Sequence, residues 1–185
     1  MSKLGVISLK VFPTNNRTVL SVLVMTLIAA VVQSVYYYPQ LPDKISSHVT
    51  VSGGVDDYTA KSQLFVLMLS TIFGTAVFLT LGTLLALKKA PQLVNLPNKE
   101  YWFTPEHKQD TIAFVFKIMV KLTIASILMM IVILQSIIWV SLGSLQSPDM
   151  FIWSATGLLC VYCLIIIIQL NRRFRLPVAE QETPT

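Results

Sequence analysis

Three side chains that could bind a divalent cation lie in one short polar stretch, from Leu41 to Lys61. His48 offers an imidazole, while Asp56 and Asp57 offer carboxylates just after a Gly53–Gly54 turn signal. Imidazole and carboxylate groups are both suitable ligands for zinc and related metals. Their spacing matches no standard site, so we predict a hydrogen-bonded loop here and no metal.

Two further groups of residues have the types found in reactive sites but lack the neighbouring residues that such sites need. His107 lies beside Glu106 and near Asp110, in a segment that the topology below places across the membrane from His48. Cys160 and Cys163 form C-x-x-C inside an apolar run, where no other cysteine can complete a zinc site. We interpret the two cysteines as small apolar packing residues.

The sequence offers little support for catalysis. It contains no nucleophile with a nearby base and no glycine-rich phosphate loop. We therefore predict that the protein is not an enzyme, has no catalytic residues and needs no cofactor. An enzyme that uses His48 or His107 is the least favoured class.

Four long apolar runs must position these polar residues. Only 12% of the chain is charged, whereas a soluble protein has roughly a quarter. A bilayer core ~30 Å thick takes about 20 helical residues, and each run is that long and free of charge. The prediction is all-α: one membrane domain, 1–185, with transmembrane helices at 19–38, 64–87, 122–142 and 150–170. The first run could instead be a signal peptide cleaved near Ala29 and Ala30, but its length favours a retained anchor.

The distribution of lysine and arginine predicts which side faces the cytoplasm. With both termini inside, twelve of these residues lie in inner segments, and only Lys44 and Lys61 lie outside. The outer loop is then 39–63, the inner loop 88–121 and the cytoplasmic tail 171–185. The net charge of +5 is explained by topology and by membrane lipid, so we expect no nucleic-acid partner.

Polar residues inside the spans are the informative ones, because an unpaired amide in hydrocarbon is costly. Gln33 and Gln135 lie at similar depths in the first and third spans. We predict that they face the bundle interior, and they either bond one another or a common partner, or satisfy local carbonyls or water. Small residues in the second span, Ser70, Gly74, Gly82 and Ala86, favour close helix packing within the chain, or else in a homodimer.

Both loops carry signals of local structure. Alternating residues from Ser47 to Ser52, followed by the glycine pair, indicate a short strand or hairpin. In the inner loop, Thr104-Pro105-Glu106 is typical of a helix start. The amphipathic segment that follows is predicted to be an interfacial helix, either before the third span or continuous with it.

The motifs "LPDKISSH....G..D.Y..K" and "NLPNKEYWFTPE" resemble a bacterial membrane domain of unknown function that also occurs in toxin-immunity proteins of the SdpI type. The resemblance covers about residues 20–140. Ser46 and Thr50 stand near places where relatives have a proline and an asparagine. The resemblance implies an integral membrane protein of the bacterial cytoplasmic (inner) membrane, in some relatives tied to toxin protection and signalling, and it implies no enzyme activity.

We predict a binding, sensory or immunity-like membrane protein, with a transporter or channel subunit as the alternative. Candidate partners are an extracellular peptide or toxin, a cytoplasmic protein and a second copy of the chain. The predicted ligand- or partner-binding residues are His48, Gly53, Asp56, Tyr58, Lys61, Tyr101, Trp102 and Glu106. Gln33 and Gln135 are the predicted intramembrane polar residues.

Overall fold

The computed structural model describes residues 16–49 and 55–176, with only the backbone described for residues 46–49, 55–58 and 92. The elements in chain order are α1 (Arg17–Tyr37), η3 (Tyr38–Gln40), β1 (Lys44–Val49), β2 (Val55–Ala60), α2 (Lys61–Lys89), η4 (Pro91–Leu93), α3 (Lys99–Trp102), α4 (Lys108–Ser141) and α5 (Asp149–Arg173). Helices dominate, which confirms the all-α fold class.

The four long helices α1, α2, α4 and α5 are each long and apolar enough to cross a membrane. They coincide with the four predicted spans, and each begins before the predicted start: by one to three residues for α1, α2 and α5, and by fourteen for α4. A helix satisfies its own backbone groups, which is why apolar runs of this length adopt it in lipid. The chain is a multi-pass membrane protein.

The predicted amphipathic segment is continuous with the third span and forms one helix, α4. No proline or glycine interrupts residues 108–141, so nothing in the sequence breaks the helix. The predicted start at Thr104 is wrong. His107 is the residue before the helix, and the Thr104 hydroxyl donates a hydrogen bond to the Tyr101 carbonyl instead of capping α4.

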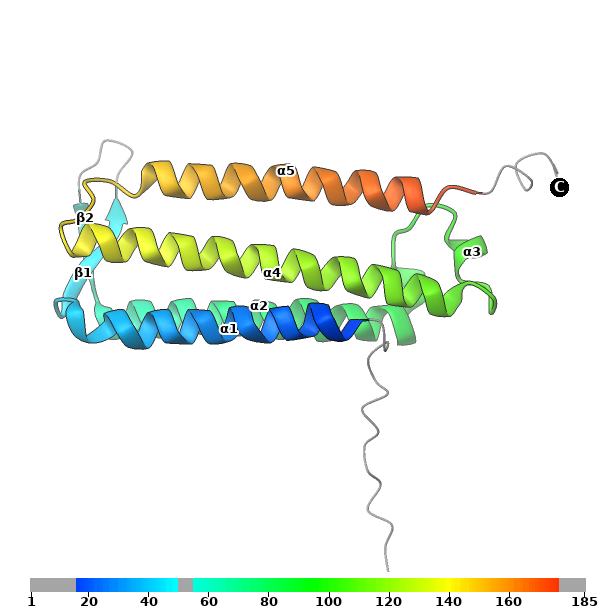
Figure 1. The fold of residues 1–185 in the computed structure, drawn as a ribbon, viewed down its shortest axis with the longest axis horizontal. Coiled ribbons are helices and arrows are strands. Elements are labelled where there is room, and N and C mark those ends of the chain that lie inside the picture. The colour runs from blue at the N-terminus through cyan, green and yellow to red at the C-terminus, as the bar shows by residue number, and fades with distance from the viewer. Residues whose placement is uncertain (1–15, 50–54, 177–185) are drawn as a thin grey trace, which may run out of the picture.

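The long helices lie in layers, with α4 in the middle (Figure 1). One layer contains α1 and α2, and the opposite layer contains α5 alone. α4 packs against all three, whereas α1 and α2 touch one another less. Ile166 is the one buried residue of α5, so most of that helix surface is open to its surroundings.

The small residues of α2 do not form a packing seam within the chain. A Cβ atom added at Gly74 or Gly82 would meet no atom of a neighbouring helix within 4 Å. The buried face of α2 carries other residues, among them Ile72, Ala76 and Leu84. The prediction of close intramolecular packing is therefore wrong at these two glycines, and a homodimer seam stays a prediction.

The predicted hairpin forms at one end of the bundle, which we call the hairpin end. β1 and β2 pair antiparallel from Lys44↔Ala60 to Val49↔Val55, with irregularities on either side of His48. Leu41 and Ile45 are buried in a cluster with residues of α2 and α4 that includes Leu134 and Ile138. The base of the hairpin is thus anchored on the membrane helices. The opposite end, which carries α3, is the α3 end.

Candidate functional site

The α3 end is built around one backbone carbonyl, that of Phe174 at the end of α5. The last carbonyls of a helix have no partner within the helix. Here the Asn98 Nδ2 group donates a hydrogen bond to the Phe174 oxygen at 2.9 Å, and the Trp102 Nε1 group donates a second at 3.1 Å. The loop before α4 therefore holds the end of α5 in place across more than seventy residues of sequence.

The backbone of Asn98 explains why an asparagine stands at this position. Its φ is +51°, in the left-handed region that asparagine tolerates better than most residues. Asn98 also precedes the short helix α3, and the Tyr101 and Trp102 amides donate to its carbonyl. The turn thus aims the Asn98 side chain at α5 while α3 carries Trp102 to the same carbonyl.

Aromatic rings fill the space beneath this turn. The Arg173 guanidinium lies 4.8 Å from the centre of the Trp102 ring and 5.7 Å from that of Phe114. A cation over a ring face is attracted by its π electrons. The Phe174 ring meets both of these rings edge-on, and the Thr111 hydroxyl donates to the Trp102 carbonyl at 2.9 Å. Loop, α4 and α5 therefore form one joint.

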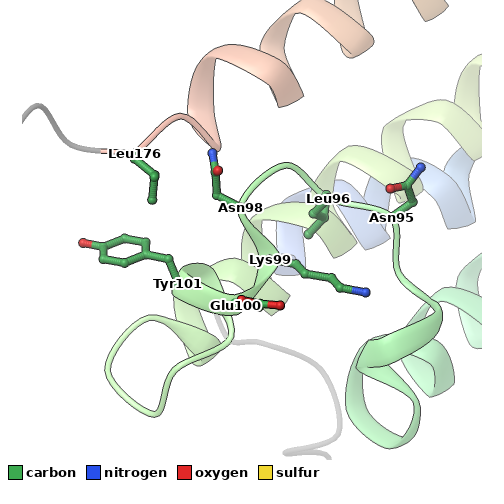
Figure 2. Close-up of a pocket in the computed structure, with 7 residues that line it drawn as sticks. All are labelled: Asn95, Leu96, Asn98, Lys99, Glu100, Tyr101 and Leu176. Carbon is green, nitrogen blue, oxygen red and sulfur yellow. The ribbon is translucent and has the colours of Figure 1, made fainter. Parts of the chain in front are cut away.

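A cavity of about 470 Å³ lies beside this joint. Figure 2 shows the residues that line it, Asn95, Leu96, Asn98, Lys99, Glu100, Tyr101 and Leu176. The Asn95 amide, the Glu100 carboxylate and the Tyr101 hydroxyl can pair with charges and hydrogen-bonding groups of a ligand, while Leu96 and Leu176 add apolar surface. The chemistry suits a peptide-like ligand that is part polar and part apolar.

The predicted residues of the inner loop have different places in this arrangement. Tyr101 lines the cavity, and its ring lies 4.7 Å from the His107 ring. Trp102 is buried and used inside the joint, so it is not a free contact surface. Glu106 is exposed in the turn before α4. Among the residues whose side chains the structure describes, 16–45, 59–91 and 93–176, no group of three or more His, Cys, Asp or Glu could hold a metal.

At the hairpin end, Lys61 is the predicted residue whose surroundings are described. Its Nζ donates to the Leu41 carbonyl at 2.9 Å, lies 3.2 Å from an Asp43 carboxylate oxygen and stands 5.2 Å from the centre of the Tyr38 ring. The Lys61 side chain is 18% exposed and that of Asp43 is 97% exposed. Lys61 thus closes the base of the hairpin and is not a free ligand for a partner.

The other predicted residues of the outer loop are only partly described. His48 pairs with Asp57 across the strands, and Tyr58 pairs with Ser46. Asp56 belongs to β2, next to the irregular pairing around His48. The side chains of His48, Asp56 and Tyr58, and the whole of Gly53, lie outside the described residues. Their roles stay predictions.

The intramembrane glutamines bond one another, which confirms the first of the two predicted alternatives. The Gln33 Nε2 group donates to the Gln135 Oε1 atom at 2.8 Å and to the Ile131 carbonyl at 3.2 Å. The Gln33 Oε1 and Gln135 Nε2 atoms are buried and have no hydrogen-bond partner in the part of the chain that the structure describes. The pair joins α1 to α4 within the bilayer.

The two cysteines of α5 differ in their surroundings. Both are free thiols, and Cys160 is exposed on the helix surface while Cys163 is half-buried. The predicted packing role is therefore wrong for Cys160 within this chain. Cys163 keeps the role in part.

Part of the chain matches a known protein family. Residues 24–73 match the domain of unknown function DUF1648. The matched segment contains most of α1, the hairpin and the first part of α2, so it includes the outer motif of the predicted resemblance and excludes the inner one. No curated protein and no solved structure is detectably similar to the chain.

Sequence reasoning missed the joint at the α3 end. It identified Asn98 and Trp102 by motif but not their common acceptor, which is a backbone atom and leaves no trace in side-chain pattern. Arg173 is one of the twelve inner basic residues, so the sequence indicates only its part in topology, whereas the structure places its guanidinium over the Trp102 ring. An asparagine after Leu-Pro and an arginine at the last turn of a helix were the available hints.

Proposed function

We propose that the protein is a binding protein of the bacterial inner membrane, which recognises an extracellular peptide or toxin at the hairpin end. In this proposal the α3 end faces the cytoplasm and presents its cavity to a cytoplasmic protein. Sensing and immunity are the two forms that such binding takes. The activity is recognition, and no catalytic step is proposed.

The observation that carries the proposal is that one unbroken helix, α4, contacts both candidate sites. Near one end, Leu134 and Ile138 pack with Ile45 at the base of the hairpin. Near the other, Thr111 bonds to the Trp102 carbonyl and Phe114 meets the Phe174 ring. A rigid helix that touches two sites can transmit a shift at one of them to the other.

The charge distribution supports the proposed orientation. Twelve of the fourteen lysine and arginine residues belong to the two terminal segments and to residues 88–121, and only Lys44 and Lys61 belong to the hairpin side. Positive residues accumulate on the cytoplasmic side of bacterial membrane proteins. Both termini are then cytoplasmic.

The cavity at the α3 end supports binding of a protein segment. Its lining offers the Asn95 amide, the Tyr101 phenol and the Glu100 carboxylate, which are groups that pair with a peptide backbone and with charged side chains. Tyr101 is a large, stiff residue of the kind that anchors protein interfaces. The cavity adjoins the joint that holds the end of α5, so a ligand bound in the cavity can shift that helix.

Protection of cells tests recognition at the hairpin. Cells that lack the gene, and cells that express the protein with His48→Ala or Asp56→Asn, are grown in medium conditioned by competing bacteria. We expect the wild-type protein to restore growth and the two variants to fail at equal membrane abundance. Lys44→Gln, a matched change on the same hairpin, should keep protection. Equal growth of all variants would contradict the proposal.

A fluorescent label tests transmission to the other end. A cysteine at Leu176, in a background where Cys160 and Cys163 are serine, places a dye on the wall of the cavity. Conditioned medium against which the wild-type protein protects cells is added to the labelled protein, and we expect it to change the emission of the dye. Asp56→Asn should abolish this change. A dye that responds equally in both proteins would argue against coupling through α4.

A transporter or channel subunit is the second candidate, and the unpartnered amide atoms of Gln33 and Gln135 favour it. Such atoms inside a span can line a polar path. A water-soluble thiol reagent distinguishes the two functions: it should modify a cysteine at position 33 in a transporter and leave it unmodified in a dry bundle.

A further inference from the structure

α1, α4 and α5 enclose an open groove along the side of the bundle. A hollow of about 440 Å³ is lined by residues of all three helices, from Thr18 and Lys121 to Leu128 and Tyr162. A second hollow of about 280 Å³ continues from it between α4 and α5. The two share Ala125, Leu128 and Tyr162, so they form one groove, which we call the side groove.

The side groove exists because α5 stands apart in its own layer. α5 packs mainly on α4, and α4 separates the layer of α5 from that of α1 and α2 (Figure 1). Val22, Leu128 and Leu158 line the groove and keep 46%, 49% and 72% of their surface exposed. The groove therefore opens sideways into the surrounding hydrocarbon.

The length of the side groove matches one leaflet of a bilayer. Lys121 lies twenty residues before Ser141, the end of α4, which is about 30 Å of helix and equals the hydrocarbon thickness. Lys121 therefore stands at the level of lipid head groups on the α3 side. Val132, at the other end of the groove, lies about 16 Å further along α4, near the bilayer midplane.

The chemistry of the side groove changes along the same direction. Its lining is apolar apart from Thr18, Lys121 and Tyr162, and Lys121 marks the end at head-group level. Arg17 begins α1 beside Thr18 and adds a second cation on the same side of the bundle, closer to the α3 end. A cation at the mouth and an apolar channel of one leaflet's depth complement an anionic lipid.

We propose that the side groove binds one phospholipid with an anionic head group. The phosphate lies against Lys121, and one acyl chain lies along α4 between α1 and α5 towards Val132. A helix of a second copy of this chain would not require a cation at one end of the groove, and it would pack along the whole span instead of ending near the midplane. A lipid therefore fits the side groove better than a second copy does. This inference does not depend on the proposed function or on which side is cytoplasmic.

Native mass spectrometry of the full-length protein tests the head-group contact. The protein in detergent is mixed with equal amounts of phosphatidylglycerol and phosphatidylcholine that carry the same acyl chains. We expect phosphatidylglycerol to be retained preferentially, and Lys121→Gln to lower the ratio of the two bound lipids about fivefold. Lys89→Gln is the matched control, because it removes an exposed cation at the same end from α2 and should leave the ratio unchanged.

A second pair of variants tests the acyl-chain contact. Ala125→Leu fills the middle of the side groove and should lower retention of both lipids. Gly157→Leu adds a side chain on the exposed surface of α5, where an added Cβ has open space, and should retain lipid as the wild type does. Equal retention of the two lipids by the wild type would overturn the proposal. So would equal effects of the Lys121 and Lys89 changes, or conversion of a dimer to a monomer by Ala125→Leu.

Discussion

Replacement of Gln33 and Gln135 by leucine, singly and together, measures the bond that joins α1 to α4 inside the membrane. Gln33 donates to both the Gln135 side chain and the Ile131 carbonyl, so Gln33→Leu removes both hydrogen bonds. Gln135→Leu removes one and leaves Gln33 bonded to the backbone. We therefore expect Gln33→Leu to reduce the free energy of unfolding more than Gln135→Leu.

The size of the coupling follows from values for hydrogen bonds between membrane helices, which run from about 0.6 to 2 kcal/mol. We expect Gln135→Leu to cost about 1 kcal/mol and Gln33→Leu about 2 kcal/mol, because the second also leaves a buried amide wholly without a partner. In the double variant neither amide remains to be orphaned. Its loss should therefore be smaller than the sum of the single losses by about 1 kcal/mol.

Reversible unfolding of the protein in bicelles, followed for all four proteins, provides the measurement. A control cycle combines Gln33→Leu with Thr71→Val on α2, whose hydroxyl bonds locally to the Leu67 carbonyl and whose side chain is exposed. That cycle should be additive within about 0.3 kcal/mol. If the glutamine cycle is equally additive, the contact between α1 and α4 at these residues is refuted.

Three further predictions concern the two ends of the bundle, each read by the same unfolding measurement. Lys61→Gln should reduce the free energy of unfolding by about 1 kcal/mol, because it removes a bond to the Leu41 carbonyl. Asp43→Asn should have little effect, because that carboxylate is almost fully exposed. Equal losses in the two variants would show that the ion pair dominates. Asn98→Gly should lose only the bond to Phe174, and Asn98→Ala should cost about 1 kcal/mol more because alanine resists a positive φ; equal stability of the two variants would contradict this. Trp102→Phe removes the second bond but keeps a ring, so it should cost about 1 kcal/mol, less than Trp102→Ala.

The membrane helices could be predicted from sequence because their cause is local. A run of about 20 uncharged apolar residues has one stable backbone conformation in lipid, so length and composition suffice. The meeting of Gln33 and Gln135 was also within reach, since two amides at the same depth gain by bonding one another. The hairpin followed from its alternating residues and glycine pair.

The rest could not be predicted because it depends on contacts between distant segments. Trp102 looked like a surface aromatic for a partner, yet its indole is used by the end of α5. Lys61 was likewise predicted to bind a partner. In the structure its ammonium group bonds to the Leu41 carbonyl and lies over the Tyr38 ring. In both cases the motif residue was found, but the partner is a backbone carbonyl, which every residue possesses.

The central place of α4 has a consequence for how the protein is made. α1 and α2 leave the ribosome first, but they hold each other less than each holds α4, which follows them. Their insertion as helices precedes their association, and lateral assembly waits until α4 has entered the bilayer. α5 then docks last, because it packs mainly on α4. By that time the loop before α4 has been made, and its Asn98 and Trp102 side chains can bond to the carbonyl at the end of α5.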